Sequence, residues 1–180
     1  EIPDMVINAF ISAEDKNFFS HKGYDPVGLL KAFYDALNGK RMRGASTITQ
    51  QVMKNFLLSN ERSVTRKIKE IILALRLEKN MPKNKILEVY LNEIYLGQGI
   101  YGVAAASYKY FGKTLNELSI SETAFLAALP KAPNRYHPVK NNKEAIARRN
   151  FVLKEMYENG FIDKETLESQ KNHTLSNFID

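Results

Sequence analysis

Apolar side chains recur at helical spacing through nearly the whole chain, and this feature restricts the fold more than any other. Residues three and four positions apart share one face of an α-helix, whereas the residues on one face of a strand alternate. Alternating patterns are nearly absent here. The sequence therefore predicts an all-α protein. Its 180 residues suit one domain, residues 1–180, and because the chain begins with Glu1 we expect that domain to be a fragment of a longer protein.

Local signals divide the chain into helices. Pro3, Pro26 and Pro82 each stand where a helix begins, and Ser119 with Glu122 forms the pattern of a capping box. Glycines and short polar stretches separate the periodic segments. We expect helices over residues 3–13, 26–37, 46–58, 61–79, 82–94, 103–110, 121–129, 142–158 and 163–170.

The expected helix 61–79 carries Glu70 among leucines, with Arg66 and Lys67 beside it. Apolar residues lie on two sides of this helix, so we expect it to be central and to line a polar cleft. An ordinary Arg66–Glu70 pair at i, i+4 spacing explains the same residues equally well.

Charge is distributed unevenly along the chain. The net charge is +6, and residues 40–85 hold twelve Lys or Arg against three acids, a net of +9. Such a block attracts phosphates in nucleic acid, anionic lipid or a pyrophosphate substrate. Charge alone favours the alternative of a solvated helix surface. The chain has no cysteine, which excludes disulfides and thiolate metal sites.

Three further segments contain residues that could take part in chemistry. Glu14 and Asp15 follow an apolar helix, where desolvation raises the pKa of a carboxyl toward that of a general base. Without further evidence, an ordinary surface acid at a helix end is the favoured interpretation. Hydroxyls and amides in residues 44–51 can cap a helix or bind sugar and phosphate oxygens. The three histidines lack metal-ligand spacing, and Arg148 and Arg149 are expected on a solvated face.

These segments together resemble the family 51 glycosyltransferases, which are the polymerase domains of class A penicillin-binding proteins and the monofunctional peptidoglycan glycosyltransferases. Five blocks of that family occur in order and cover nearly the whole chain. They are EDKNFFSHKG at 14–23, GASTITQQ at 44–51, RKIKE at 66–70, KNKILEVYLN at 83–92 and RRNFVL at 148–153.

The resemblance implies a lysozyme-like helical head with a smaller, membrane-facing jaw. It implies an inverting transfer that polymerises lipid II into β-1,4-linked glycan strands and releases undecaprenyl pyrophosphate. Glu14 is then the catalytic base and Glu70 a second essential acid, which either orients a lysine or holds a divalent ion. The substrate-binding residues implied are Ser46, Thr47, Gln50, Gln51, Lys54, Arg62, Arg66, Lys67 and Lys69.

The same resemblance implies partners and a location. The partners are lipid II, the lipid-linked glycan chain and the membrane surface, with the antibiotic moenomycin as an inhibitor in the donor site and no role for nucleic acid. The location is the outer face of the cell membrane, with an anchoring segment outside these 180 residues. The sequence requires no cofactor, and Mg²⁺ or Mn²⁺ remains open.

Two other functions compete with this interpretation. A lysozyme-like glycoside hydrolase also uses two acids in a helical cleft, with water as acceptor, but has no need of the basic block. A basic helical module that binds anionic membrane or another protein explains the charge without explaining Glu14 and Glu70 together.

Overall fold

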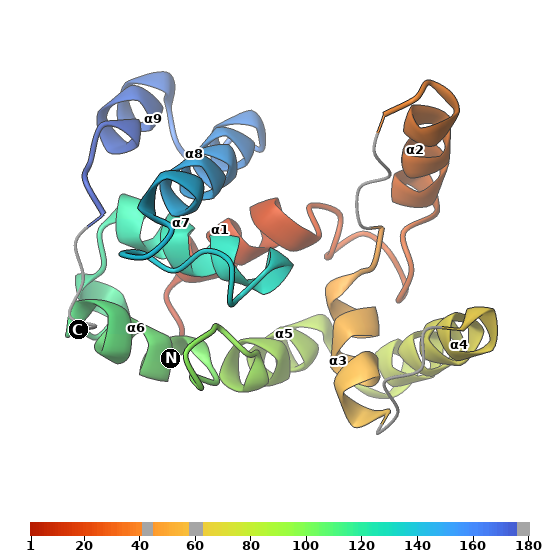
Figure 1. Ribbon diagram of the computed structural model, residues 1–180. Coiled ribbons are helices and arrows are strands. Elements are labelled where there is room, and N and C mark those ends of the chain that lie inside the picture. Colours follow the sequence, from red (N-terminus) through yellow and green to blue (C-terminus); the bar gives the residue numbers. More distant parts are fainter. Residues whose placement is uncertain (41–44, 58–62, 176–180) are drawn as a thin grey trace. The chain divides into compact units, whose positions relative to one another are not determined.

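The computed structural model describes residues 1–40, 45–57 and 63–175 (Figure 1). Helices dominate these residues, and within them only an isolated bridge between Tyr95 and Tyr101 has β geometry. The all-α prediction is therefore confirmed. The helices are α1 (Asp4–Glu14), α2 (Pro26–Leu37), α3 (Ile48–Phe56), α4 (Val64–Asn80), α5 (Lys83–Glu93), α6 (Val103–Phe111), α7 (Ile120–Ala128), α8 (Asn142–Glu158) and α9 (Lys164–Lys171), with short 3₁₀ turns η1 (Leu115–Glu117) and η2 (Leu129–Lys131).

The chain divides into two compact units. One, here called the terminal unit, combines Glu1–Lys16 with Leu91–Asp180, and the other, the middle unit, is Asn17–Tyr90. The chain passes from one unit to the other after Lys16 and again after Tyr90, within α5. The predicted helices 26–37 and 142–158 have the observed bounds, and the others differ by one to three residues at an end.

The terminal unit is built around α7, which packs against α1 and α8 (Figure 1). All of its residues from Ser121 to Ala128 except Glu122 are buried. Many of these residues are small, which lets the neighbouring helices approach closely. Phe125 supplies the bulk and meets Tyr110 and Phe111 edge to face, with ring centroids 5.3 and 5.7 Å away. This core fixes the C-terminal end of α1.

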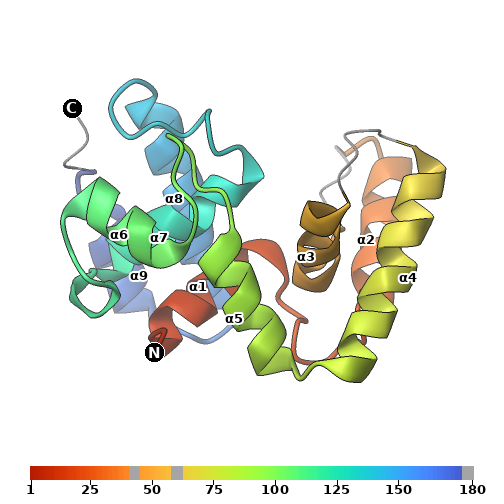
Figure 2. The ribbon, with the colours of Figure 1, turned by 90° about the horizontal axis from the view of Figure 1, so that it is seen from below.

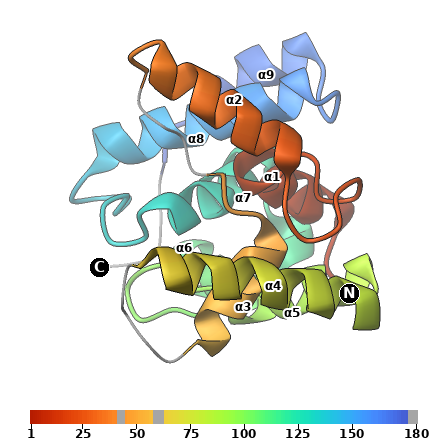
Figure 3. The same cartoon turned by 90° about the vertical axis from the view of Figure 1, so that its right-hand side faces the viewer.

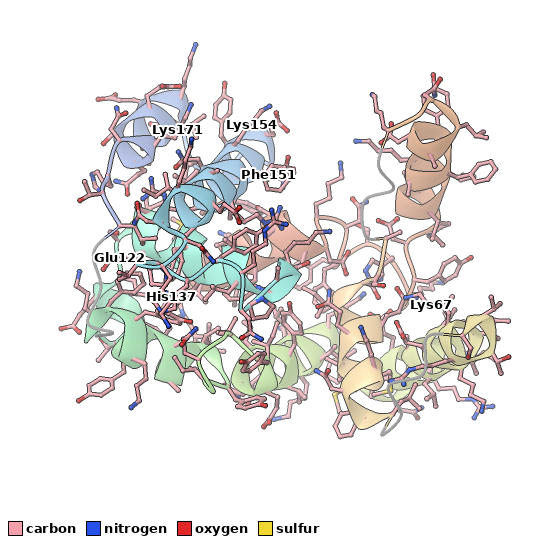
Figure 4. All side chains as sticks on the ribbon, in the orientation of Figure 1. Lys67, Glu122, His137, Phe151, Lys154 and Lys171 are labelled. Atoms are coloured by element: carbon pink, nitrogen blue, oxygen red, sulfur yellow. The ribbon has the colours of Figure 1, made fainter. Side chains whose placement is uncertain are left out.

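The predicted capping box begins α7. The Ser119 hydroxyl accepts the Glu122 N–H at 3.0 Å, and the Glu122 carboxylate accepts the Ser119 N–H at 2.9 Å. Glu122, labelled in Figure 4, also accepts a hydrogen bond from Lys113 at 2.8 Å. These bonds satisfy N–H groups that the first turn of a helix leaves without intrahelical partners.

Arg149 contradicts its predicted solvated position. Its side chain is fully buried, and the guanidinium donates to the carbonyls of His173 at 2.8 Å and Lys171 at 3.1 Å. Sequence periodicity did not reveal this role because the partners are backbone carbonyls at the end of α9. The buried cation thereby fixes that end of α9 against α8.

In the middle unit, α3 packs against α4 (Figure 2). The helix α2 stands apart from both of them, as Figures 1 and 3 show. Ala32 is its one buried residue, while Leu30, Phe33 and Leu37 are 63–71% exposed. The apolar face of α2 is therefore not covered by the described part of its own unit.

The helix α4 is not the central, buried helix that its pattern predicts. Only Glu70 and Ala74 are buried along it, and Val64, Ile68 and Ile72 are exposed at 78, 53 and 43%. Periodicity indicates which faces of a helix are apolar but not what covers them, so the prediction was wrong about burial while right about the helix.

Candidate functional site

Glu14 is the last residue of α1, and the packing of α1 on α7 and α8 fixes its position within the terminal unit. Its side chain is partly exposed, as a group that exchanges protons with a ligand must be. Desolvation by burial raises the pKa of Glu14 from 4.5 to about 7, while the positive charges of Arg148 and Lys131 act in the opposite direction and Asp15 raises the pKa further. The carboxyl can therefore accept a proton near neutral pH.

Two cations lie close enough to act electrostatically on Glu14, and they come from distant parts of the chain. Arg148 belongs to α8, and its guanidinium lies 4.6 Å from the ring centroid of Phe151, which is labelled in Figure 4. Lys131 belongs to the 3₁₀ turn η2 and lies between the expected helices 121–129 and 142–158. Both cations favour the ionised form of the Glu14 carboxyl.

Sequence analysis did not give Arg148 or Lys131 a role at Glu14. Arg148 begins the block RRNFVL at 148–153, so its membership of that block was the available signal, whereas Lys131 lies outside the five blocks that carry the resemblance. Their effect on Glu14 depends on contacts between segments more than one hundred residues apart, which spacing along one helix does not reveal.

In the middle unit, Glu70 is buried and forms an ion pair with Lys67. The Lys67 ammonium group lies 2.9 Å from Glu70 Oε1 and 2.6 Å from the Ser46 hydroxyl, and Figure 4 labels Lys67 on α4. The structure therefore pairs Glu70 with Lys67 at i, i+3 instead of with Arg66 at i, i+4. Arg66 donates instead to the Leu57 carbonyl, at 3.1 Å.

Thr47 and Gln50 begin α3 as a buried capping box. The Thr47 hydroxyl accepts the Gln50 N–H at 3.1 Å, and Gln50 Oε1 accepts the Thr47 N–H at 2.7 Å. The same hydroxyl donates to the carbonyl of Gly23 at 2.7 Å. Both side chains are almost fully buried, so their polar groups shape the segment beside Ser46 instead of facing solvent.

The remaining predicted site residues occupy different surroundings. Gln51 is partly exposed and accepts a hydrogen bond from the Tyr90 hydroxyl at 3.5 Å. Lys54 and Lys69 are exposed on α3 and α4. Arg62 lies outside the described residues. The structure thus brings Ser46, Thr47, Gln50, Lys67 and Glu70 together, and it leaves Lys54 and Lys69 at the surface of the unit.

Lys67 is the partner of Glu70 that the described residues provide. No group of three or more His, Asp or Glu side chains that could hold a metal is found within residues 1–40, 45–57 and 63–175. Glu70 already accepts the Lys67 ammonium group. Because Mg²⁺ is commonly held by one or two carboxylates together with substrate phosphates, a divalent ion at Glu70 stays a prediction.

Comparison with known proteins finds relatives that match nearly the whole chain. The transglycosylase family model matches residues 1–157. Penicillin-binding protein 1A of Aquifex aeolicus is 50% identical over 177 residues, which cover 98% of this chain and 24% of that protein. The corresponding protein of Rickettsia typhi is 49% identical over 170 residues (92% and 22%), and that of Escherichia coli is 46% identical over 177 residues (98% and 21%).

A solved structure gives a similar result. The crystal structure of penicillin-binding protein 1A from Haemophilus influenzae matches with a TM-score of 0.59 at 27% identity, over 99% of this chain and 17% of that one. The chain thus spans between a fifth and a quarter of the length of the curated relatives named here. A family model that covers residues 1–157 and relatives of this similarity lead to one conclusion: the chain belongs to the transglycosylase family.

Proposed function

We propose that this chain is a peptidoglycan glycosyltransferase that polymerises lipid II, with Glu14 as the catalytic base. The observation that carries the proposal is a carboxyl at the end of α1 whose pKa is raised to about 7, in a member of the transglycosylase family. A base is most effective when its pKa lies near the working pH, because it is then both sufficiently ionised and sufficiently basic.

In the proposed reaction, the Glu14 carboxylate removes the proton from the 4-hydroxyl of the acceptor's GlcNAc. The oxygen attacks the anomeric carbon of the lipid-linked donor with inversion, and the bond to undecaprenyl pyrophosphate breaks. Arg148 and Lys131 stabilise negative charge beside Glu14 as the acceptor enters.

The middle unit supplies the cations proposed for the donor pyrophosphate. Lys67 is held between Glu70 and Ser46, so its ammonium group is already oriented before a substrate arrives. Such preorganisation lowers the cost of placing positive charge where a leaving group becomes more negative. Lys54, Arg66 and Lys69 add charge nearby on α3 and α4, and Arg62 belongs to the same basic block.

The experiment that tests this function uses labelled lipid II in detergent, with wild type beside Glu14→Gln and products separated by length. Polymer from the wild type alone supports the proposal. Short, water-terminated sugars from the wild type instead favour the lysozyme-like hydrolase. If neither protein makes a product and both bind anionic vesicles equally well, the result favours the basic binding module.

We also propose that the middle unit meets a membrane surface at the outer face of the cell membrane. None of the helices in the described ranges is long and apolar enough to cross a bilayer. The exposed apolar residues of α2, including Leu30 and Phe33, support contact with a bilayer surface instead. Substituting both by serine is expected to reduce sedimentation with phosphatidylglycerol vesicles. Tyr108→Ser and Val139→Ser, exposed in the terminal unit, provide the control.

Moenomycin is proposed to occupy the donor site of the middle unit. If so, Lys54→Ala combined with Arg66→Ala weakens its binding because two cations of the basic block are lost. The measurement is a calorimetric titration of the 180-residue chain, and unchanged affinity in the double variant contradicts this placement.

A further inference from the structure

A buried polar cluster in the middle unit joins four separate segments. Glu78 of α4 accepts the ammonium group of Lys83, which begins α5. It also accepts the Thr49 hydroxyl of α3 at 3.3 Å. The Glu78 and His21 side chains are only 6 and 3% exposed, and Glu78 Oε2 lies 3.8 Å from His21 Nδ1. A carboxylate buried as deeply as that of Glu78 needs partners, so the cluster fixes the relative positions of the segments it joins.

The loop between Asn17 and Asp25 wraps around one side of this cluster. The Lys83 ammonium group lies 3.3 Å from His21 Nδ1 and 4.5 Å from the ring centroid of Phe18. His21 Nδ1 also accepts the N–H of Gly23 at 3.1 Å. Lys83 therefore contacts an imidazole and an aromatic face of the same loop, in addition to the Glu78 carboxylate.

Gly23 connects this loop to the segment that holds Ser46. Its carbonyl accepts the Thr47 hydroxyl at 2.7 Å, and Thr47 is the N-cap of α3. Gly23 also packs tightly on α4, where an added Cβ would lie 2.9 Å from the Ala74 carbonyl carbon. The loop is thus fixed by Lys83 on one side and supports the start of α3 on the other.

We infer that Lys83 and Glu78 are positioning residues, which act through His21 and Gly23 to hold Ser46 and the α3 N-terminus in the geometry that receives the donor. Neither side chain contacts Glu70 or Lys67 in the described structure, so their effect on a substrate is indirect. The inference rests on the proposed function for its substrate, and on the hydrogen bonds above for its route.

Removing Lys83 leaves the Glu78 carboxylate buried without its cation. Hydration of the unpaired Glu78 carboxylate then becomes favourable, and the loop loses its contacts with the Lys83 ammonium group. Because donor binding depends on the loop while the base lies on α1, the change raises KM and leaves kcat largely unchanged. A residue that serves only stability would instead lower activity through the fraction of folded protein.

Two measurements compare Lys83→Met with Lys85→Met. Lys85 lies on the same helix and pairs with exposed Glu88 at 3.3 Å, so its variant removes an equivalent charge outside the cluster. We expect Lys83→Met to raise KM for lipid II by about tenfold with kcat within about twofold. We also expect faster amide hydrogen exchange in residues 17–24 and 45–52, and Lys85→Met to change neither quantity.

Two further variants test the physical cause. Lys83→Arg retains the charge and is expected to restore most of the KM. Glu78→Gln combined with Lys83→Met removes both charges and is expected to perturb exchange less than Lys83→Met alone, because no buried charge is left unpaired. These variants keep the inference testable if Lys83→Met alone does not fold.

The inference is overturned if Lys83→Met and Lys85→Met have the same KM and the same exchange rates. Exchange that accelerates uniformly over the described chain, with kcat falling in parallel, also overturns it because that pattern indicates stability alone. If the wild type makes no polymer, the proposed function fails, and the exchange comparison still decides whether Lys83 and Glu78 control residues 45–52.

Discussion

The ammonium group of Lys67 lies 2.9 Å from the carboxylate of Glu70, one helical turn further along α4. Glu70 is the acid that the family resemblance implies to be essential, and this ion pair engages its carboxylate. Removing the carboxylate charge leaves Lys67 without its buried partner. Glu70→Gln is therefore expected to lower kcat/KM for lipid II by about ten- to a hundredfold, because the lysine is no longer held toward Ser46. Initial rates at several lipid II concentrations provide the measurement.

The control for that prediction separates a lysine partner from a metal. Incubating the wild type with EDTA is expected to leave its rate unchanged, since the described residues around Glu70 provide a lysine and no cluster of further acids. Loss of activity with EDTA and its recovery with Mg²⁺ or Mn²⁺ would instead assign Glu70 to an ion.

The pKa of Glu14 predicts how the reaction rate depends on pH. Its carboxyl must be ionised to act as a base, so kcat/KM is expected to rise with pH through about 7 and then to level off. Arg148 lowers the pKa of Glu14, and therefore Arg148→Gln is expected to move that rise to higher pH. Arg135→Gln is the control, because Arg135 pairs at 2.7 Å with exposed Glu144. An unshifted profile in Arg148→Gln would contradict the assigned electrostatic contact.

The same raised pKa makes Glu14 unfavourable for stability at high pH. The pKa of the folded protein, about 7, exceeds the ordinary value of 4.5, so the folded state binds more protons than the unfolded state between these values. The free energy of unfolding therefore falls as pH rises through this window. Glu14→Gln removes the effect and is expected to be more stable than wild type at pH 8 by on the order of 3 kcal/mol, with little difference at pH 4.

Thermal denaturation of the two proteins at both pH values measures this difference. A Glu14→Gln variant that is less stable than wild type at pH 8 would show that the carboxylate makes favourable contacts in the fold. The raised pKa would then be wrong.

Gly23 is expected to tolerate no side chain. It has φ of 118°, which residues other than glycine adopt rarely, and a Cβ there would lie 2.9 Å from the Ala74 carbonyl carbon and oxygen. Gly23→Ala is expected to cost about 2–4 kcal/mol of stability. Gly39→Ala is the matched control, because Gly39 also has a positive φ, of 75°, but no atom lies within 4 Å of the added Cβ. Equal losses of melting temperature in the two variants would exclude the contact with α4 as the cause.

The sequence predicted the helices well because caps and periodicity are local. The capping box at Ser119 and the bounds of α2 and α8 follow from residues within one or two turns. Burial was predicted less well. The exposed Ile68 face of α4 and the buried guanidinium of Arg149 depend on what other segments cover, and periodicity does not contain that information.

The candidate site also combines features that the local sequence predicts with features that distant segments determine. Glu14 and Glu70 were selected from their local surroundings and from the family resemblance. Which lysine pairs with Glu70 is set by side-chain geometry on α4, and the pKa of Glu14 is set partly by Arg148 and Lys131, far along the chain. The roles proposed for the substrate-binding residues remain predictions, and Arg62 lies outside the described residues.

The division of the chain into units has a consequence for synthesis on the ribosome. The middle unit is continuous, from Asn17 to Tyr90, so its contacts can form as soon as that stretch has emerged. The helix α1 emerges first, yet its partners α7 and α8 begin more than one hundred residues later. The helix α1, with its candidate base, is therefore made before its packing partners, while the segment that follows it can already fold. The desolvation that raises the pKa of Glu14 is therefore complete only after both α7 and α8 have been made.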